Sequence, residues 1–458
     1  MDQDGSRISV RANLAGGKGS PAHADKSYMR AVVAGLLAAG ACSLTAAPAA
    51  SASPISPKPA SSFHDSVGVV THIVYFDTAY GDWPRVVARL QELGVRHLRD
   101  GVFANPSPQW RDWNERYYRA VELAASRGMR FTFGVNPPGR GTGSLDELLD
   151  VIGGRLRNAA EAVEAPNEFD KYVGGRGWPL ALASYGRQLH VKAKARGTTR
   201  SLPILGPSFA TPQGPSRVGD LRGLVDVGNI HPYTGGLSPH PEHIKAELAR
   251  ARITASGKPV WATEVGFHNA MRASVDAQAP VSERAAAIYL LRTFLEHYRA
   301  GIRRTFAYEL IDEKRDPAGR DAEQHFGLLR NDFSRKPAFH ALRNLLATVG
   351  RDRMRGRLVP LRMAISRPER EVRRLVLQKA DGSYVVALWR LGSVWDIERR
   401  APLGVATRRV SVRLPGAQRV SLADPARSAG ERSVPLRDGR VRVRLGARPL
   451  LLHVFPRP

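Results

Sequence analysis

The feature that most constrains this chain is a repeated alternation between residues 63 and 350. Short runs rich in β-branched and aromatic residues recur there, and most precede a longer segment with helical spacing of apolar residues. Units of this kind place successive strands parallel in one sheet. The predicted strands are residues 67–73, 95–100, 129–135, 161–168, 203–208, 227–233, 260–265 and 304–310. The predicted helices are residues 84–93, 109–127, a segment beginning with Ser144 and Glu147 spaced as a capping box, 179–196, 282–300 and 336–349.

Eight strand–helix units indicate the α/β class and a (β/α)8 TIM barrel, because eight parallel strands close into a cylinder. An open doubly wound sheet is the alternative. Such a sheet rarely needs eight units, and no G-x-G-x-x-G motif follows the first predicted strand. We therefore expect residues 63–350 to form a barrel.

The pattern changes after residue 351, where helical spacing stops and short strand-like runs follow turn dipeptides such as Asp381-Gly382. The run Arg440–Leu445 alternates arginine with valine or leucine, so one face of that strand is apolar and the other is charged. Residues 353–458 are predicted to form a small antiparallel β-sandwich domain.

The amino-terminal region has the layout of a secretory signal peptide. Lys26 and Arg30 precede the apolar run 31–41, which is too short to span a membrane, and small residues lead to Ala52. We assign residues 1–52 to the signal peptide region and expect a secreted, extracellular protein, in which cell-surface association is an open alternative.

Residues 53–62 are rich in proline and serine and are predicted to be a linker. The single cysteine, Cys42, lies within the signal region, so disulfide bonds are not expected to stabilise the mature chain. A lipoprotein anchor at Cys42 is a weaker alternative, because Ala39 stands where such signals have leucine.

The chain carries a formal net charge of +27, and residues 351–458 hold 25 Lys and Arg against 9 Asp and Glu. This excess is compatible with an anionic envelope surface or an acidic glycan as partner, but a solvated arginine-rich surface is the favoured explanation, because net charge bears on solubility and non-specific binding. No nucleic-acid reader motif accompanies the charge, so a specific nucleic-acid partner is not expected.

Two carboxyl side chains stand at predicted strand ends, where TIM barrels carry their functional residues. Glu168 ends the fourth strand and Glu264 ends the seventh. Glycosidic cleavage needs two carboxyl groups, one that protonates the departing oxygen and one that attacks the anomeric carbon or activates water. Glu168 and Glu264 are therefore candidates for such a pair.

These motifs resemble glycoside hydrolase clan A, the four/seven superfamily, over residues 63–350. The resemblance implies that Glu168 is the acid/base, with a raised pKa, and that Glu264 is the nucleophile, so that their carboxyls should lie about 5–5.5 Å apart. The resemblance implies that Asn167, in the pair Asn167-Glu168, contacts the sugar 2-hydroxyl. It implies that Arg99, at the end of the second strand, keeps Glu264 ionised. His231-Pro232-Tyr233 matches the end of the sixth strand in the clan. Tyr233 is expected to contact the nucleophile, and His231 is expected to contact the substrate or the acid/base.

Family five and family thirty-nine members of the clan give the nearest resemblance, supported by the stretch leading to the last barrel helix and by the closing strands near 448–455. Tyr308 stands where the clan often has a tryptophan that floors the sugar site. His72 and Asp100 are further candidate substrate contacts. The sequence shows no metal-ligand motif, so no metal or other cofactor is expected.

The sequence therefore predicts a secreted retaining hydrolase that cleaves O-glycosidic bonds of a poly- or oligosaccharide. Three alternatives stay open: a non-catalytic envelope glycan-binding protein, a polyanion-binding protein acting through its basic carboxyl-terminal domain, and a transglycosylase that uses the same two glutamates.

Overall fold

A computed structural model describes residues 51–458, apart from 138–142, 275–277, 369 and 458. Most of the predicted signal peptide region, with Cys42, lies outside the described residues. The described helices are too short or too polar to cross a membrane.

Eight parallel strands form one sheet in the order β7-β6-β5-β4-β3-β10-β9-β8. The first and last strands of the repeat, β3 and β10, pair directly, and a parallel bridge between Leu205 and Val227 joins the two ends of the sheet. The sheet thus closes on itself, which confirms the predicted TIM barrel. The strands are β3 (Val67–Val70), β4 (His97–Gly101), β5 (Arg130–Gly134), β6 (Ala160–Glu164), β7 (Ile204–Leu205), β8 (Gly228–Ile230), β9 (Val260–Val265) and β10 (Arg304–Ala307).

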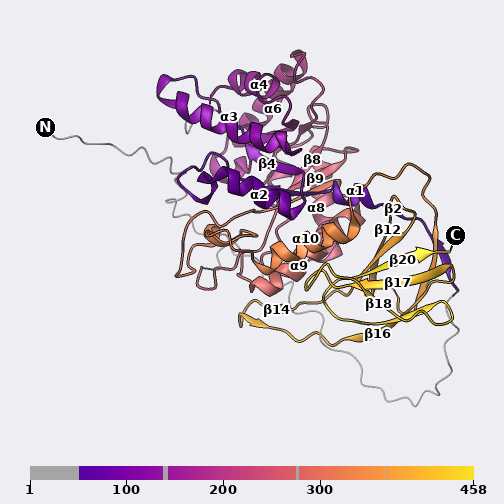
Figure 1. The fold of residues 1–458 in the computed structure, drawn as a ribbon. Coiled ribbons are helices and arrows are strands. Elements are labelled where there is room, and N and C mark those ends of the chain that lie inside the picture. Colours follow the sequence, from indigo (N-terminus) through magenta and orange to yellow (C-terminus); the bar gives the residue numbers. More distant parts are fainter. Residues whose placement is uncertain (1–50, 138–142, 275–277, 369, 458) are drawn as a thin grey trace. The chain divides into compact units, whose positions relative to one another are not determined.

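Helices surround this barrel, as the indigo to orange ribbon in Figure 1 shows. The capping box at Ser144 is confirmed, because Ser144 and Glu147 exchange backbone-to-side-chain hydrogen bonds at the start of the third long helix. A helix after the sixth strand, α8, was not predicted. The longer helices are α2 (Trp83–Leu93), α3 (Arg111–Ser126), α4 (Leu145–Gly153), α6 (Trp178–Ala195), α8 (Pro241–Thr254), α9 (Glu283–Ala300) and α10 (Pro337–Val349), and the short ones are α1 (Ala60–His64), α5 (Phe169–Tyr172) and α7 (Gly214–Val218).

Two further sheets confirm the predicted β-sandwich domain, drawn mainly in orange and yellow in Figure 1. In β19 the side chains of Val441 and Val443 are buried while those of Arg442 and Arg444 are exposed, as the alternation predicts. One sheet contains β1 (Ser53–Ile55), β11 (Leu361–Ile365), β16 (Arg408–Arg413) and β19 (Arg440–Leu445). The other contains β18 (Arg432–Ser433), β17 (Ala417–Ala423), β20 (Leu450–Pro456), β13 (Tyr384–Trp389), β12 (Arg373–Gln378) and β2 (Lys58–Pro59).

The predicted linker is corrected by the structure. Within residues 53–62, β1 pairs antiparallel with β11, β2 pairs parallel with β12, and α1 then begins. Both short strands lie at sheet edges, where proline is tolerated because one side of the backbone needs no ladder hydrogen bond. The prolines made these two strands look like a linker in the sequence. The sandwich is therefore built from one segment that precedes the barrel in the chain and a longer one that follows it.

Barrel and sandwich share buried contacts. One apolar cluster includes Leu345 of α10 together with Leu377 of β12 and Leu451 of β20. Arg373 of β12 donates two hydrogen bonds of 2.9 and 3.0 Å to Glu296 of α9. The sandwich is therefore packed against the barrel through both apolar contacts and an ion pair.

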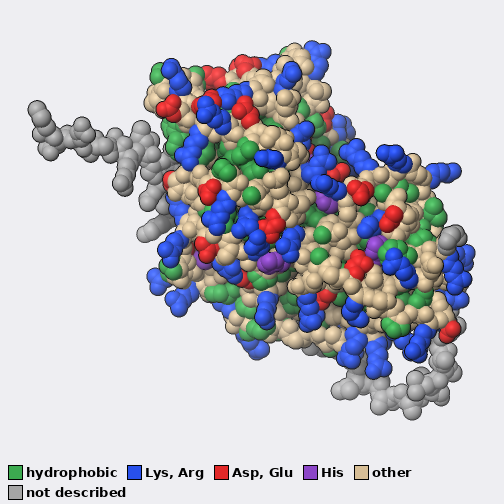
Figure 2. All heavy atoms as spheres, in the orientation of Figure 1, with side chains coloured by type: hydrophobic (Ala, Val, Ile, Leu, Met, Phe, Trp, Pro, Cys, Tyr) green, Lys and Arg blue, Asp and Glu red, His purple; other side chains and the backbone are tan. Residues whose placement is uncertain are grey.

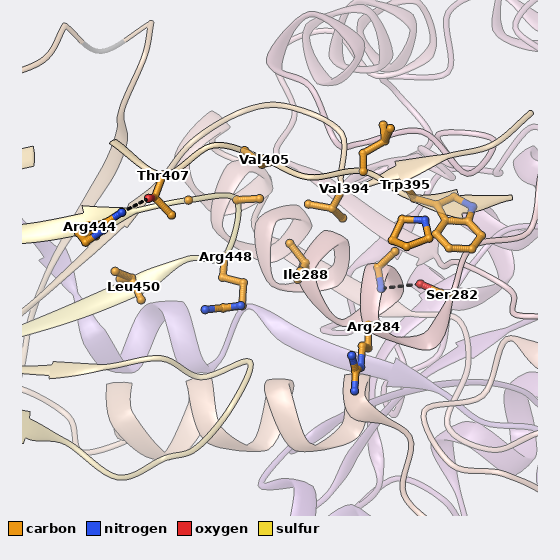
Figure 3. Close-up of a pocket in the computed structure, with 15 residues that line it drawn as sticks. Ser282, Arg284, Ile288, Val394, Trp395, Val405, Thr407, Arg444, Arg448 and Leu450 are labelled. Carbon is orange, nitrogen blue, oxygen red and sulfur yellow. Dashed lines mark hydrogen bonds between the residues drawn. The ribbon is translucent and has the colours of Figure 1, made fainter. Parts of the chain in front are cut away.

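A groove of about 490 Å³ lies where α9 meets the sandwich and the hairpin of β14 (Trp395–Asp396) and β15 (Ala401–Pro402). Figure 3 shows its apolar side chains, among them Ile288 and Val394, and its arginines. The residues that line it include none of the predicted catalytic or substrate-binding residues.

Candidate active site

The two predicted catalytic glutamates meet at the carboxyl ends of the barrel strands. Glu264 lies within β9, whereas Glu168 lies four residues beyond the end of β6, which stops earlier than predicted. Glu168 has a left-handed backbone with φ 40° and ψ 46°, just before α5. Glu168 and Glu264 are 9% and 7% exposed as whole residues, and a carboxylate oxygen of one lies within 4.8 Å of a carboxylate oxygen of the other. The pair is compact and nearly enclosed.

Glu264 is held at both oxygens. Nη1 of Arg99 donates a hydrogen bond to Oε1, and the hydroxyl of Tyr233 donates to Oε2 at 2.9 Å. Charge-assisted bonds of this kind favour the ionised carboxyl and fix its orientation. The structure thus brings Arg99 and Tyr233 to the residue to which the resemblance assigns them.

Arg99 has a second partner that the sequence analysis missed. Its Nε and Nη2 donate to the two oxygens of Glu164, both at 2.9 Å, and Glu164 is fully buried at the end of β6. Asn229 and Thr263 also donate to Glu164 Oε1, at 2.9 and 3.1 Å. This inward-facing carboxylate fixes the guanidinium that in turn positions Glu264. No sequence pattern identified Glu164, which lies four residues before Glu168, as a functional residue.

Glu168 faces His231. Nδ1 of His231 lies 2.9 Å from Glu168 Oε1 and 3.6 Å from Glu264 Oε2, and its Nε2 lies 3.0 Å from the Thr263 hydroxyl. Lys171 Nζ lies 3.8 Å from the other oxygen of Glu168. The imidazole therefore lies between the two carboxylates and contacts the acid/base candidate directly.

The expected raised pKa of Glu168 is wrong for the free site. Burial raises this pKa, but the hydrogen bond and the positive charge of His231 outweigh burial and leave the pKa below its ordinary value. Burial lowers the pKa of His231, but Glu264 and Glu168 outweigh it and raise the pKa overall. Both shifts are in the direction that favours an ion pair between His231 and Glu168.

Asn167 joins the same network. Its Oδ1 accepts hydrogen bonds from Arg99 Nη2 at 2.7 Å and from the Ser208 hydroxyl at 3.2 Å, and its backbone N–H donates to Asn136 Oδ1 at 3.1 Å. With the carbonyl oxygen engaged, the NH₂ group of Asn167 is the end that can donate to a ligand.

Asp100, predicted as a substrate contact, is buried and holds a loop. It accepts hydrogen bonds from the Thr71 hydroxyl at 2.6 Å and from the Ile73 backbone N–H at 3.0 Å, and burial raises its pKa to about 7. The described contacts of Asp100 tie the end of β3 to β4 rather than joining the carboxylate pair.

His72 and Tyr308 lie on the other side of the site. Their rings pack edge to face with centroids 5.7 Å apart, and Tyr308 also packs against Tyr233 and Phe326. The peptide bond from Tyr308 to Glu309 is cis. Tyr308 therefore belongs to an aromatic cluster that includes Tyr233, whose hydroxyl donates to Glu264.

Among the described residues, two sets of three side chains bring metal-ligating atoms within 4.8 Å of one another. One is Glu168, His231 and Glu264, and the other is His72, Glu309 and Glu313. The second set was not predicted, because His72 is far in sequence from Glu309 and Glu313.

No protein-family model and no curated protein sequence matches the chain. Solved structures do match. A family 39 glycoside hydrolase from Bacteroides cellulosilyticus WH2 aligns with a TM-score of 0.57 and 15% identity over 87% of this chain and 81% of that chain. The chain has the fold of family 39 glycoside hydrolases.

Two more solved structures align with the chain to a similar extent. A family 39 enzyme from Xanthomonas axonopodis pv. citri aligns with a TM-score of 0.55 and 14% identity, covering 88% of this chain and 96% of the other. A monomeric β-xylosidase from Caulobacter crescentus CB15 aligns with a TM-score of 0.57 and 13% identity, covering 88% and 98%. Because both barrel and sandwich are covered, the predicted resemblance to clan A is confirmed at the level of the fold.

Proposed function

We propose that this protein is a retaining glycoside hydrolase with Glu264 as nucleophile and Glu168 as acid/base. The observation that carries the proposal is the approach of their carboxylate oxygens to within 4.8 Å. Retaining enzymes place the two carboxyls about 5–5.5 Å apart, whereas inverting enzymes leave about 6.5–9.5 Å for a water molecule. The family 39 fold supports the same reaction class.

In the first step an oxygen of Glu264 attacks the anomeric carbon as the bond to the leaving oxygen breaks. Arg99 and Tyr233 orient Glu264 through their hydrogen bonds to its two oxygens. The leaving oxygen takes a proton from Glu168. In the second step Glu168 removes a proton from water, which attacks the same carbon and releases Glu264.

In this mechanism Glu168 obtains its proton from His231. Nδ1 of His231 lies 2.9 Å from Glu168 Oε1. A neutral sugar covering the pair removes water and penalises the two separate charges, so the proton moves from His231 to Glu168 before cleavage. The proton returns to His231 when Glu168 has deprotonated water.

The substrate is proposed to be a neutral or acidic poly- or oligosaccharide met outside the cell, in line with the predicted signal peptide. The test is hydrolysis of a panel of aryl glycosides and of plant, fungal and bacterial polysaccharides by wild type and Glu264→Gln. Activity that disappears in the variant supports the proposal. Sugar binding without hydrolysis by the wild type would favour the non-catalytic glycan-binding alternative, and a product longer than the substrate would indicate transglycosylation.

A second proposal places an anionic partner at the groove beside α9. Arg284, Arg444 and Arg448 line it, and no Asp or Glu is among its described lining residues. Basic side chains are spread widely over the face shown in Figure 2. The groove is therefore distinguished from the rest of the basic surface by its concave shape and apolar floor rather than by charge alone. Acidic glycan should bind more weakly to a variant carrying Arg284→Gln and Arg444→Gln than to one carrying Arg432→Gln and Arg437→Gln, two control positions on the exposed surface. Equal weakening in both would show that total charge alone attracts the glycan.

A further inference from the structure

The sheet β1-β11-β16-β19 of the sandwich has one apolar face and one basic face. Val410 and Val412 of β16 pair with Val443 and Val441 of β19, and all four belong to the buried core of the sandwich. Side chains alternate between the two faces of a strand, so the residues at the intervening positions point outward. The outward arginines form an arginine face, which consists of Arg362 of β11, Arg409 and Arg413 of β16, and Arg440, Arg442 and Arg444 of β19.

The strand register places like charges directly opposite each other on this face. Arg413 pairs with Arg440, and Arg409 pairs with Arg444. The Cβ atoms of such partners lie about 4.5–5.5 Å apart, and like charges in these positions destabilise a sheet. A solvated surface needs charge but does not need this pairing, and local features that cost stability are typical of functional sites. The register therefore indicates that the arginine face serves a ligand of opposite charge.

Acidic side chains do not neutralise the arginine face. The strands β1, β11, β16 and β19 contain no Asp or Glu, and among the described residues none of the six arginines forms an ion pair. Two of them have neutral partners. Arg362 donates a hydrogen bond to the Ala52 carbonyl at 3.2 Å, and Arg444 donates one to the Thr407 hydroxyl at 3.2 Å (Figure 3). On the barrel surface, by contrast, Arg155 is paired with two glutamates. The charge of the arginine face is therefore available to a partner.

Protection of a sheet edge does not account for all of this charge. Charged side chains on an edge strand discourage pairing with another chain, and β19 is an edge strand. Arg409 and Arg413, however, lie on β16, which is flanked by β11 and β19, and Arg362 lies on β11, which is flanked by β1 and β16. These two inner strands have no free edge to protect. The arginine face therefore extends beyond what an exposed edge requires.

The shape of the arginine face favours a planar partner. Five of its six arginines lie on the neighbouring strands β16 and β19, and neighbouring strands are rotated by only about 20–25°. Proteins that hold a single polyanionic strand combine a basic groove with aromatic rings that stack on it. The other outward side chains of the four strands are Pro54, Ala364 and Ser411, so the face offers no ring for stacking and no large apolar group for insertion. A flat anionic surface fits these properties best.

We propose that the arginine face binds the anionic headgroups of a phospholipid bilayer and holds the protein at the membrane surface. A guanidinium can donate two parallel hydrogen bonds to one phosphate, which suits arginine better than lysine to this task. Because the contact is electrostatic and superficial, it should weaken steeply as salt is added. This proposal does not depend on the proposed hydrolase function, and the arginine face shares only Arg444 with the groove beside α9.

The test is co-sedimentation of full-length protein with vesicles made of equal parts of phosphatidylcholine and phosphatidylglycerol. Each arginine close to an anionic surface strengthens binding by about fivefold, so a variant that loses four of them should bind at least about 100-fold more weakly. Arg444 is kept, because it also lines the groove. The four changes are Arg409→Gln, Arg413→Gln, Arg440→Gln and Arg442→Gln. A control with the same net charge changes four exposed arginines of the barrel and should stay within about threefold of wild type. Its changes are Arg127→Gln, Arg157→Gln, Arg187→Gln and Arg252→Gln.

Three results would overturn the proposal: wild-type protein that does not sediment with these vesicles, equal binding to vesicles of phosphatidylcholine alone, or a sandwich variant that binds as well as the barrel control. Binding of a soluble polyuronate through the same four arginines, without binding to vesicles, would also overturn it and would identify an acidic polymer as the partner. If the sandwich variant folds poorly, the wild type decides. Phenylglyoxal modifies accessible arginines, and vesicles should protect the arginine face while the control positions still react. Equal modification with and without vesicles would refute the proposal.

Discussion

Replacing Glu164 with glutamine tests the buried network that positions the proposed nucleophile. Glu164 accepts two hydrogen bonds of 2.9 Å from Arg99 and others from Asn229 and Thr263, in a fully buried setting. Glutamine has nearly the same shape, but it is neutral and offers one oxygen where the carboxylate offers two. The guanidinium then loses one of two charge-assisted bonds and its buried counter-charge.

Breaking a buried ion pair by removing one partner costs about 3–5 kcal/mol. Each charge-assisted hydrogen bond contributes about 1.5–3 kcal/mol, so the one bond that Arg99 loses accounts for a large part of that cost. Arg99 retains Glu264 and Asn167 as partners, so the loss should be near the lower end of the range for a broken buried ion pair. We therefore expect Glu164→Gln to lower the free energy of unfolding by about 3 kcal/mol.

The assay is urea-induced unfolding followed by tryptophan fluorescence. Glu115→Gln is the matched control, because Glu115 also accepts two hydrogen bonds from one arginine, Arg155, but on the exposed surface. Solvent screens that pair, so the control should stay close to wild type. A Glu164→Gln protein as stable as the control would refute the reasoning, since it would mean that the Glu164 charge is not needed to hold Arg99.

Three further predictions follow from described contacts. Tyr233→Phe removes a 2.9 Å hydrogen bond to Glu264 and should lower kcat/KM about 10- to 100-fold, whereas an unchanged rate would show that the bond does not act in the transition state. The folded-state pKa of Glu168 is lowered, so its stabilising contribution is present above about pH 4.3 and is lost as pH falls through that folded pKa. The folded-state pKa of His231 is raised, so its contribution is present below about pH 6.5 and is lost as pH rises through the folded pKa. The stability difference between wild type and His231→Asn should therefore peak between those values, and a pH-independent difference would contradict the ion pair. Glu296→Gln breaks the bidentate contact to Arg373 and should speed proteolysis at the barrel–sandwich junction without changing KM, whereas a changed KM would show that the junction reaches the site.

Local patterning was enough to predict the architecture. Burial of one face requires apolar residues at strand or helix spacing, so the eight units and the alternation in Arg440–Leu445 are visible without coordinates. Glu264 could be found because it ends such a strand, and Glu168 was found although β6 ends four residues earlier. The two edge strands in residues 53–62 were missed, because proline-rich segments that join a sheet edge have no pattern of their own.

What the sequence by itself determined is the barrel, the sandwich and the positions of the two candidate catalytic glutamates, because each depends on spacing along the chain. Only the tertiary structure decided that Glu164 holds Arg99, that His231 contacts Glu168, and that His72 approaches Glu309 and Glu313. These properties depend on distances and burial between residues far apart in sequence. Electrostatic energies change steeply with both quantities, and neither can be read from spacing along one strand or helix.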